Sequence, residues 1–266
     1  MLLRLSVLLG FTAGFSLGVV LLLAQVTGQA TALPWTALTQ IHGQIQIVGF
    51  VGLFILGTAS QLLPGFLARP LEHRSRLVLG GALIAAGLVL RALSQPFAAS
   101  PVRAIALGLS GIGELAGLVL CLAVYAQLLR RSIQPRELWR TIVALGFGCL
   151  VLSLIVNLVA VGALIDGSDV VPWSLDAALI QLELWGFAVP IVFGVSRKIL
   201  PRFLLLPAPN DCGLRWSILG YLGGVALIFV GWLTSAVLPV SPVGRDLRVV
   251  GAWGQFVGGV ALVWFL

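Results

Sequence analysis

Apolar stretches of about 20 residues recur along the whole chain, and this recurrence restricts the fold more than any other feature. As a helix, each stretch is long enough to cross about 30 Å of membrane hydrocarbon. Hydrophobic residues make up 59% of the 266 residues and charged residues only 9%, too little polar surface to cover a water-soluble protein of this size. The sequence therefore predicts an all-α, polytopic integral membrane helical bundle, a single membrane domain over residues 1–266. Its eight transmembrane helices are expected at about 5–27, 43–65, 76–96, 104–128, 141–163, 178–200, 216–238 and 249–266.

The positive charges fall mainly between these stretches, with a strong bias to one side. Because cytoplasmic loops carry the excess of Lys and Arg, we expect both termini inside, N-in/C-in, in a bacterial inner membrane. The first stretch is longer than the apolar region of an ordinary secretory signal, so we expect it to stay as a helix. The net charge of +7 then reflects topology in a lipid bilayer and not a nucleic-acid-binding face. The basic residues expected inside are Arg4, Arg69, Arg74, Arg76, Arg130, Arg131, Arg136, Arg140, Arg197, Lys198, Arg202 and Arg215; those expected outside are Arg103, Arg245 and Arg248.

Two segments that lie 137 positions apart are similar. GFVGLFILGTASQLLPGFL (49–67) aligns with GFAVPIVFGVSRKILPRFL (186–204), with identical residues at seven positions. This offset predicts a four-helix unit present twice, at about 1–133 and 134–266. Because four spans is an even number, both copies would have the same orientation, as parallel repeats related by an axis along the membrane normal.

Glycines spaced four residues apart occur on several of the expected helices. In lipid, helices associate through close backbone contact, which small residues permit. We therefore expect these glycines at helix–helix contacts within the chain, with formation of a homodimer through one such face as the alternative. The spacing occurs at Gly10/Gly14/Gly18, Gly113/Gly117, Gly220/Gly224 and Gly254/Gly258.

Ionisable side chains are rare inside the apolar stretches, and each costs at least about 2.5–3.5 kcal/mol to insert. Arg91, Glu114 and Glu183 lie in the third, fourth and sixth stretches, and Gln46 and Asn157 are weaker members of the set. The expected topology places them in the outer half of the bilayer, with Glu114 nearer the middle. Two interpretations stay open. Arg91 pairs with a carboxylate and only locks helices together, or these side chains line a pocket that opens outward, where Arg91 neutralises a ligand carboxylate such as a haem propionate.

The chain has two histidines, which the expected topology places on opposite sides of the membrane. His73 lies in a basic cytoplasmic loop, where contact with solvent or lipid headgroups is expected. His42 begins the second stretch on the outer side, where its imidazole could be an axial ligand of haem iron. The alternative role of His42 is a hydrogen-bonded helix cap or a residue at the membrane interface. One chain cannot supply two histidines to one haem, so the sixth ligand would be a Gln, Met1, water, an exogenous ligand or a residue of a neighbouring chain.

The second stretch resembles the second-helix signature of NnrS-type membrane proteins through His42, Gly49, Phe50, Gly57 and Pro64. The resemblance continues weakly through Arg69, Pro70, Arg91 and the SRKILPRF stretch, and covers about two thirds of the chain. It also extends to subunit I of haem-copper oxidases, in which a histidine on the outer side of helix two ligates low-spin haem. The resemblance implies a polytopic inner-membrane protein that holds haem, and in some members copper, and is linked to nitric oxide metabolism.

This chain departs from the family pattern at two positions. Gln44 stands where the family has a second histidine, and Ile45 where it has an acidic residue. With no other histidine in any span, a copper site has almost no ligands. Cys121, Cys149 and Cys212 form no CxxC pair, so neither a disulfide nor a cysteine-metal site is expected.

Three functions are consistent with these residues. The first is a haem-b-binding protein for electron transfer or gas-related chemistry, a possible subunit of a respiratory complex, with His42 as metal ligand and Gln46, Arg91, Glu114 and Glu183 as further cofactor-binding residues. The second is a cofactor-free structural subunit that packs against other membrane chains, and the third is a small-molecule or ion transporter. No nucleophile triad, P-loop, dinucleotide-binding glycine motif or HExxH motif indicates an independent enzyme class.

Overall fold

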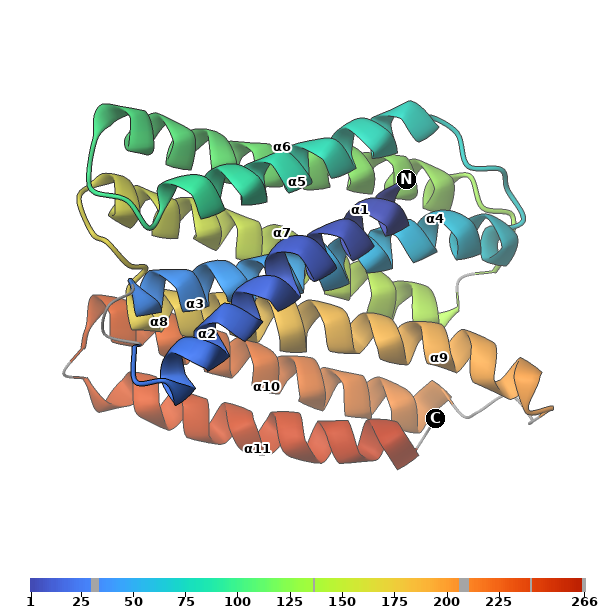
Figure 1. The fold of residues 1–266 in the computed structure, drawn as a ribbon. Helices are drawn as coiled ribbons and strands as arrows, with labels where there is room; N and C mark the ends of the chain where they lie inside the picture. Colours follow the sequence, from blue (N-terminus) through green and yellow to red (C-terminus); the bar gives the residue numbers. More distant parts are fainter. Residues whose placement is uncertain (30–33, 136, 206–210, 240, 265–266) are drawn as a thin grey trace. The chain divides into compact units, whose positions relative to one another are not determined.

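Eight long helices make up the computed structural model, which describes all residues except 30–33, 136, 206–210, 240 and 265–266 (Figure 1). Each helix is long and apolar enough to cross a membrane, and the described residues contain no β-strand. The predicted all-helical, multi-pass membrane architecture is therefore confirmed. The helices cover residues 2–26, 35–67, 74–94, 101–130, 138–165, 173–203, 211–237 and 242–264.

All eight helices begin earlier than predicted, most clearly the second and the eighth, which begin eight and seven residues early. The second begins with α3 (Trp35–Gln44), and the sixth with α8 (Trp173–Ile180), eight and five residues before the predicted starts. Polar residues such as Thr36 and Gln40 lower the hydropathy of these first turns without interrupting the helix. Hydropathy therefore marks the part of a helix within hydrocarbon and misses the turns that continue beyond it.

In the part of the chain that the structure describes, three π-helical segments interrupt the spans. In the first helix, η1 (Gly10–Phe15) separates α1 (Leu2–Leu9) from α2 (Ser16–Val26). In the second, η3 (Ile45–Gly52) separates α3 from α4 (Leu53–Leu67), and in the sixth, η4 (Gln181–Ala188) separates α8 from α9 (Val189–Phe203). A π segment changes the rotation of the helix and often occurs at functional sites. Gln46 lies in η3 and Glu183 in η4, so both candidate residues occupy such a segment.

The chain divides into two compact units. Unit 1 contains Met1–Gln134 and Leu154–Val171, and unit 2 contains Pro135–Ser153 and Pro172–Leu266. The fifth helix, α7 (Leu138–Ile165), contributes its first part to unit 2 and its last part to unit 1.

In unit 1, α5 (Arg74–Ser94) and α6 (Pro101–Arg130) form a closely packed hairpin (Figure 1). A Cβ on Gly117 would lie only 2.4 Å from the carbonyl oxygen of Gly80, and a Cβ on Gly87 would lie 2.6 Å from that of Ser110. Only glycine permits this separation. The expected role of Gly117 in helix contact is therefore confirmed.

Unit 2 contains a similar hairpin of α10 (Asp211–Val237) and α11 (Pro242–Trp264). A Cβ on Gly224 would lie 2.3 Å from the backbone nitrogen of Gln255, and a Cβ on Gly258 would lie 2.4 Å from that of Tyr221. Beside these glycine contacts lies a largely apolar core that also includes the first part of α7. Its buried members are Ile142, Leu214, Ile218, Tyr221, Val225 and Leu262.

Candidate functional site

The glycines of the first helix form a face that accommodates side chains of the second helix. A Cβ on any of three glycines would lie 2.7–2.9 Å from the side chain opposite it. The three pairs are Gly10–Phe50, Gly14–Gln46 and Gly18–His42. The predicted packing role of this glycine ladder is confirmed, and two of the candidate cofactor-binding residues lie on it.

The His42 imidazole is half-buried and held by one backbone hydrogen bond. Its Nδ1 lies 3.0 Å from the carbonyl oxygen of Gly14. A carbonyl only accepts, so Nδ1 carries the hydrogen, and in the neutral ring Nε2 keeps its lone pair. Among the described residues Nε2 has no hydrogen-bond partner. Since His42 lies two turns inside the helix that begins at Trp35, the helix-cap alternative is wrong.

Arg91, Asn157 and Glu114 form a buried polar cluster that joins three helices of unit 1. The Arg91 guanidinium donates through Nη1 to Oδ1 of Asn157, and Nδ2 of Asn157 donates to Oε2 of Glu114 over 3.3 Å. Arg91 is 1% exposed, and Asn157 and Glu114 are fully buried. Arg91 Nη2 and Glu114 Oε1 have no hydrogen-bond partner among the described residues. Asn157 thus stands between Arg91 and Glu114, whereas one of the two open interpretations of the sequence had Arg91 pair directly with a carboxylate.

Two glutamines extend this cluster toward the end of unit 1 where α5 ends. Arg91 Nε donates to Gln95 over 3.0 Å, and Gln95 donates to Gln40 over 3.1 Å. Gln40 in turn donates to the carbonyl of Val171 and accepts from its N–H, at 2.8 and 2.9 Å. Gln95 also lies in the wall of a cavity of about 350 Å³, together with Trp35 at the start of α3 and residues of neighbouring loops. The polar side chains therefore form a continuous path from this cavity to Glu114.

Gln40 and Gln95 were not predicted from the sequence as site residues, and the predicted position of Arg103 was wrong. Arg103 was expected in an outer loop, but it lies in the first turn of α6 and is 4% exposed. Its guanidinium donates to the carbonyls of Leu164 at 3.0 Å and Ser168 at 3.1 Å. The helix-start signal before it, with a capping Ser100 and then a proline, would have placed Arg103 inside a helix.

Glu183 lies in unit 2, where it is fully buried within η4. Near it in sequence, Gln181 donates to Gln255 of α11 over 2.9 Å, and the Tyr221 hydroxyl donates to the carbonyl of Trp185 over 2.9 Å. Gln181, Tyr221 and Gln255 also line a mostly apolar cavity of about 610 Å³.

The candidate cofactor-binding residues therefore fall into three groups, two in unit 1 and one in unit 2. His42 and Gln46 lie on the glycine face of the first helix, Arg91 and Glu114 lie in the buried cluster, and Glu183 belongs to unit 2. Within unit 1, the Arg91 guanidinium is hydrogen-bonded to Gln95 and Asn157. Its Nη2 has no hydrogen-bond partner among the described residues, and the role of Arg91 toward a haem propionate stays a prediction.

The chain matches no protein-family model, no curated protein and no solved structure.

Proposed function

We propose that this multi-pass membrane protein binds one haem b through Nε2 of His42 and takes part in electron transfer or gas-related chemistry, as its resemblance to NnrS-type proteins implies. The hydrogen bond between His42 Nδ1 and the Gly14 carbonyl carries this proposal. Metal-bound histidines commonly fix one ring nitrogen in this way and ligate through the other. The His42 ring therefore fits a haem ligand, and the bound haem would supply the redox chemistry.

Fewer groups could be the sixth ligand of a His42-bound haem than the sequence left open. Leu3 lies against Gly57, fifteen residues beyond His42 in the same helix. At about 1.5 Å per residue, roughly 22 Å separates these two levels, so Met1 of the same chain does not reach a haem on His42. Gln46 lies one turn along the same helix face as His42 and cannot reach the opposite side of the same iron, so the sixth ligand would be water, an exogenous ligand or a residue of a second chain.

Our proposal includes the orientation and the repeat. Both termini face the cytoplasm of a bacterium, since twelve basic residues then lie inside and three outside. The two halves descend from one four-helix unit. The starts of η3 and η4 support this, since they are 136 positions apart, close to the offset between the similar segments.

The first experiment is spectroscopic. Protein purified in mild detergent from haem-supplied cells is expected to show a b-type spectrum in its oxidised and dithionite-reduced forms and in a pyridine haemochrome assay. His42→Ala is expected to remove the signal, while His73→Ala, which changes the other histidine, is expected to retain it. A folded wild-type protein without haem would overturn the proposal.

A second pair of variants tests the position of the ring without removing it. A Cβ on Gly18 would lie 2.9 Å from His42 Cε1, so Gly18→Ala is expected to displace the imidazole and reduce haem content. Gly43→Ala is the matched control, because its Cβ would meet nothing within 4 Å. Equal haem content in these two variants would contradict ligation at the observed His42 position.

The alternative is a cofactor-free structural subunit. It is favoured by the internal use of Arg91 and Glu114, which hydrogen-bond Asn157 and so join helices of the same unit. Comigration of a haem-free chain with a larger membrane complex on native gels, and loss of that complex on deletion of the chain, would support this function.

A further inference from the structure

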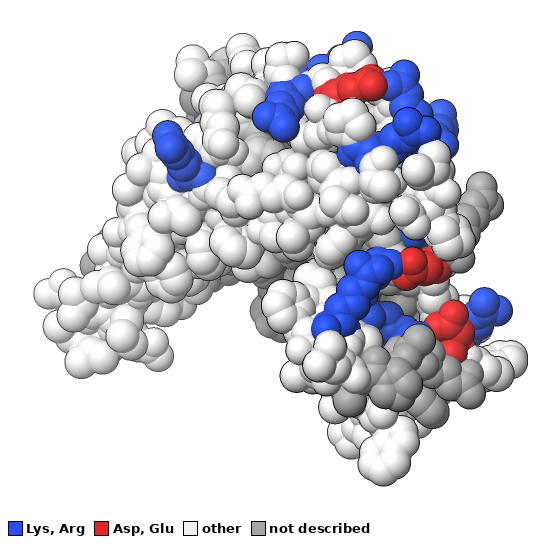
Figure 2. Space-filling view, turned by 90° about the vertical axis from the view of Figure 1, so that its right-hand side faces the viewer, with Lys and Arg blue, Asp and Glu red and all other residues white. Residues whose placement is uncertain are grey.

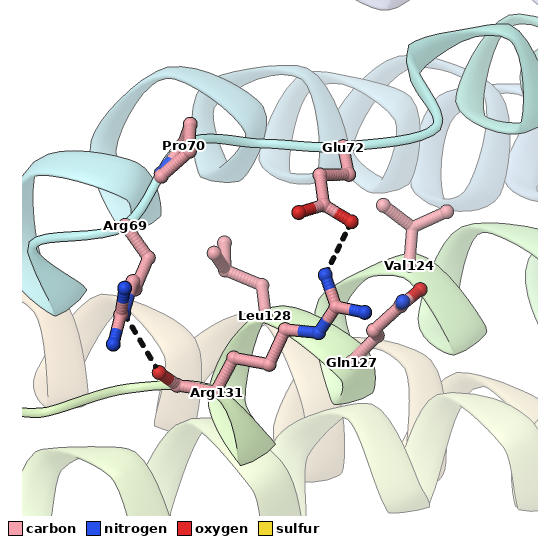
Figure 3. A pocket seen from close by; sticks show the side chains of 7 residues that line it. All are labelled: Arg69, Pro70, Glu72, Val124, Gln127, Leu128 and Arg131. Carbon is pink, nitrogen blue, oxygen red and sulfur yellow. Dashed lines mark hydrogen bonds and ion pairs between the residues drawn. The ribbon is translucent and has the colours of Figure 1, made fainter.

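A cavity of about 370 Å³ with both charged and apolar walls lies at the end of unit 1 where α4 and α6 end and α5 begins (Figure 3). One wall is the segment between α4 and α5, which carries Arg69, Pro70 and Glu72, and the opposite wall is the last turns of α6. Figure 3 shows the side chains of both walls facing the same space. The seven lining residues are Arg69, Pro70, Glu72, Val124, Gln127, Leu128 and Arg131.

Backbone geometry fixes the position of Arg69 in this cavity. Ala68 ends α4 in the left-handed conformation, with φ of 51°, and the N–H of Arg69 then donates to the carbonyl of Pro64 over 3.1 Å. The side chain of Arg69 reaches across the cavity, and its Nε donates to the backbone carbonyl of Arg131 over 3.0 Å (Figure 3). Among the described residues, Nη1 and Nη2 of Arg69 have no hydrogen-bond partner. The guanidinium therefore keeps donors for a ligand.

The second arginine of the cavity is held by an exposed ion pair. Arg131 Nη1 donates to Oε2 of Glu72, and the two side chains are 53% and 50% exposed. Such a pair contributes little to stability, because water screens both charges. Arg131 can therefore exchange Glu72 for another anion at little cost. Gln127 adds a neutral hydrogen-bonding side chain to the same wall.

Charge and apolar surface meet at this cavity. Five arginines and one glutamate lie on the ends of α5 and α6 and the segment before α5, and Figure 2 shows Lys and Arg side chains gathered on this face of the molecule. The arginines are Arg69, Arg74, Arg76, Arg130 and Arg131, and the glutamate is Glu72. Buried Val124 and Leu128, with Pro70, supply the apolar part of the lining. Because the surrounding helices are membrane-spanning, the cavity lies at the level of lipid headgroups.

We propose that this cavity binds the phosphate group of an anionic phospholipid, with Arg69 as the main donor, Arg131 as the second donor, and the apolar wall against the upper part of an acyl chain. Guanidinium groups suit phosphate because they donate several hydrogen bonds in a planar arrangement. Glu72 opposes binding, since it competes with the phosphate for Arg131. The site is independent of His42 and of any haem.

The test measures thermal stabilisation of the full-length protein by phosphatidylglycerol, in nanodiscs of defined composition, with phosphatidylcholine alone as the reference. Phosphatidylglycerol is expected to raise the midpoint of unfolding of the wild type. Arg69→Gln is expected to increase the half-saturating lipid fraction about tenfold, as expected for loss of charged hydrogen bonds. Arg4→Gln is the matched control: it also removes one exposed arginine but lies outside the cavity.

Two further results distinguish the proposal from general charge attraction and from a soluble ligand. Glu72→Gln is expected to lower the half-saturating lipid fraction, because Arg131 is then free to bind phosphate. Equal effects of Arg69→Gln and Arg4→Gln would overturn the site in favour of non-specific attraction. Equal stabilisation by inorganic phosphate in detergent, without anionic lipid, would overturn the lipid assignment and identify a soluble phosphate compound as the ligand.

Discussion

The α5–α6 hairpin of unit 1 and the α10–α11 hairpin of unit 2 achieve the same close backbone contact with different side chains between their helices. In both, glycines bring the backbone of one helix against the other. The residues 137 positions beyond Arg91 and Glu114 are Ile228 and Gly251. A Cβ on Gly251 would lie 2.8 Å from Cγ1 of Ile228, so this second pair forms an apolar contact. At the position of Arg91 and Glu114 the second hairpin therefore has no ionisable residue, and its Arg248 instead donates to the Gly231 carbonyl and to Ser235 of α10.

The difference indicates what the polar cluster contributes. Removing an arginine and a carboxylate from water costs free energy, and an apolar pair of similar volume is often as stable or more stable. An apolar pair, however, makes no directional hydrogen bond. Asn157 links α5 and α6 to α7 through hydrogen bonds that form in only one register, whereas apolar contacts tolerate several. The polar cluster of unit 1 thus specifies an arrangement of helices more than it stabilises one.

The largest effect is expected from disrupting the close glycine contact that the two hairpins share. A Cβ on Gly117 would lie 2.4 Å from the Gly80 carbonyl oxygen, and a Cβ on Gly251 would lie 2.7 Å from the Gly224 carbonyl oxygen. Gly117→Leu and Gly251→Leu must therefore separate their helices, and each is expected to destabilise by more than about 3 kcal/mol. Thermal unfolding in detergent, followed by tryptophan fluorescence, measures the loss. Gly223→Leu, on an open position, is the control, and similar stability of all three proteins would contradict the close contacts.

The next effect concerns the buried pair that only the α5–α6 hairpin has. Replacing Glu114 is expected to cost more stability than replacing Arg91. Glu114→Leu leaves the Arg91 guanidinium buried without a counter-charge, and arginine cannot lose its proton. The expected destabilisation is about 3–5 kcal/mol. Arg91→Leu is expected to cost less, because the remaining carboxylate can take up a proton. Thermal unfolding of both variants in the same detergent gives the order, and a larger loss for Arg91→Leu would contradict this explanation.

The same hairpin can be given the apolar contact of unit 2. Arg91→Ile combined with Glu114→Gly and Asn157→Leu removes the guanidinium, the carboxyl group and the bridging amide of the cluster together. This triple variant is expected to be more stable than Glu114→Leu alone, because no buried charge is left unpaired. If the triple variant is less stable than Glu114→Leu, the hydrogen bonds of the polar cluster stabilise unit 1 in addition to keeping its buried groups paired.

The number and nature of the helices could be predicted from the sequence because lipid requires each span to be long, apolar and internally hydrogen-bonded. Glycine contacts were predictable for a related reason, since spaced small residues serve few purposes in a lipid-facing helix other than close packing. The extra turns at Trp35 and Trp173 were missed because hydropathy does not report helix that continues outside hydrocarbon.

The partners of the polar residues could not be predicted in the same way. Arg91, Glu114 and Asn157 were recognised individually, because each is costly in a membrane span. That Asn157 stands between the other two depends on the separation and rotation of three helices, which no local pattern encodes. Gln40 and Gln95 lie near helix ends, where polar residues are ordinary, so nothing in their positions indicated that they continue the cluster.

A moderate effect is expected from the bridging amide alone. Asn157→Leu removes the acceptor for Arg91 Nη1 and the donor to Glu114, which leaves further buried groups without partners. The expected destabilisation is about 2–3 kcal/mol. Asn157→Asp keeps an acceptor for Arg91 and is expected to cost less. Unfolding of the two variants under identical conditions decides the order, and equal losses would mean that hydrogen bonding to Arg91 contributes little.

The smallest effect compares a buried serine in each unit. Ser6 Oγ donates to the carbonyl of Phe50 over 2.9 Å and so joins the first and second helices of unit 1, whereas Ser217 Oγ donates over 2.9 Å to Gly213 of its own helix. Ser6→Ala removes a hydrogen bond between helices and is expected to cost about 1 kcal/mol. Ser217→Ala removes a bond within one helix that contributes little or slightly bends it, so its expected effect is near zero. Thermal unfolding of both variants measures the difference. If the Ser217 variant loses more stability than the Ser6 variant, the hydrogen bond between helices does not contribute more than the bond within one helix.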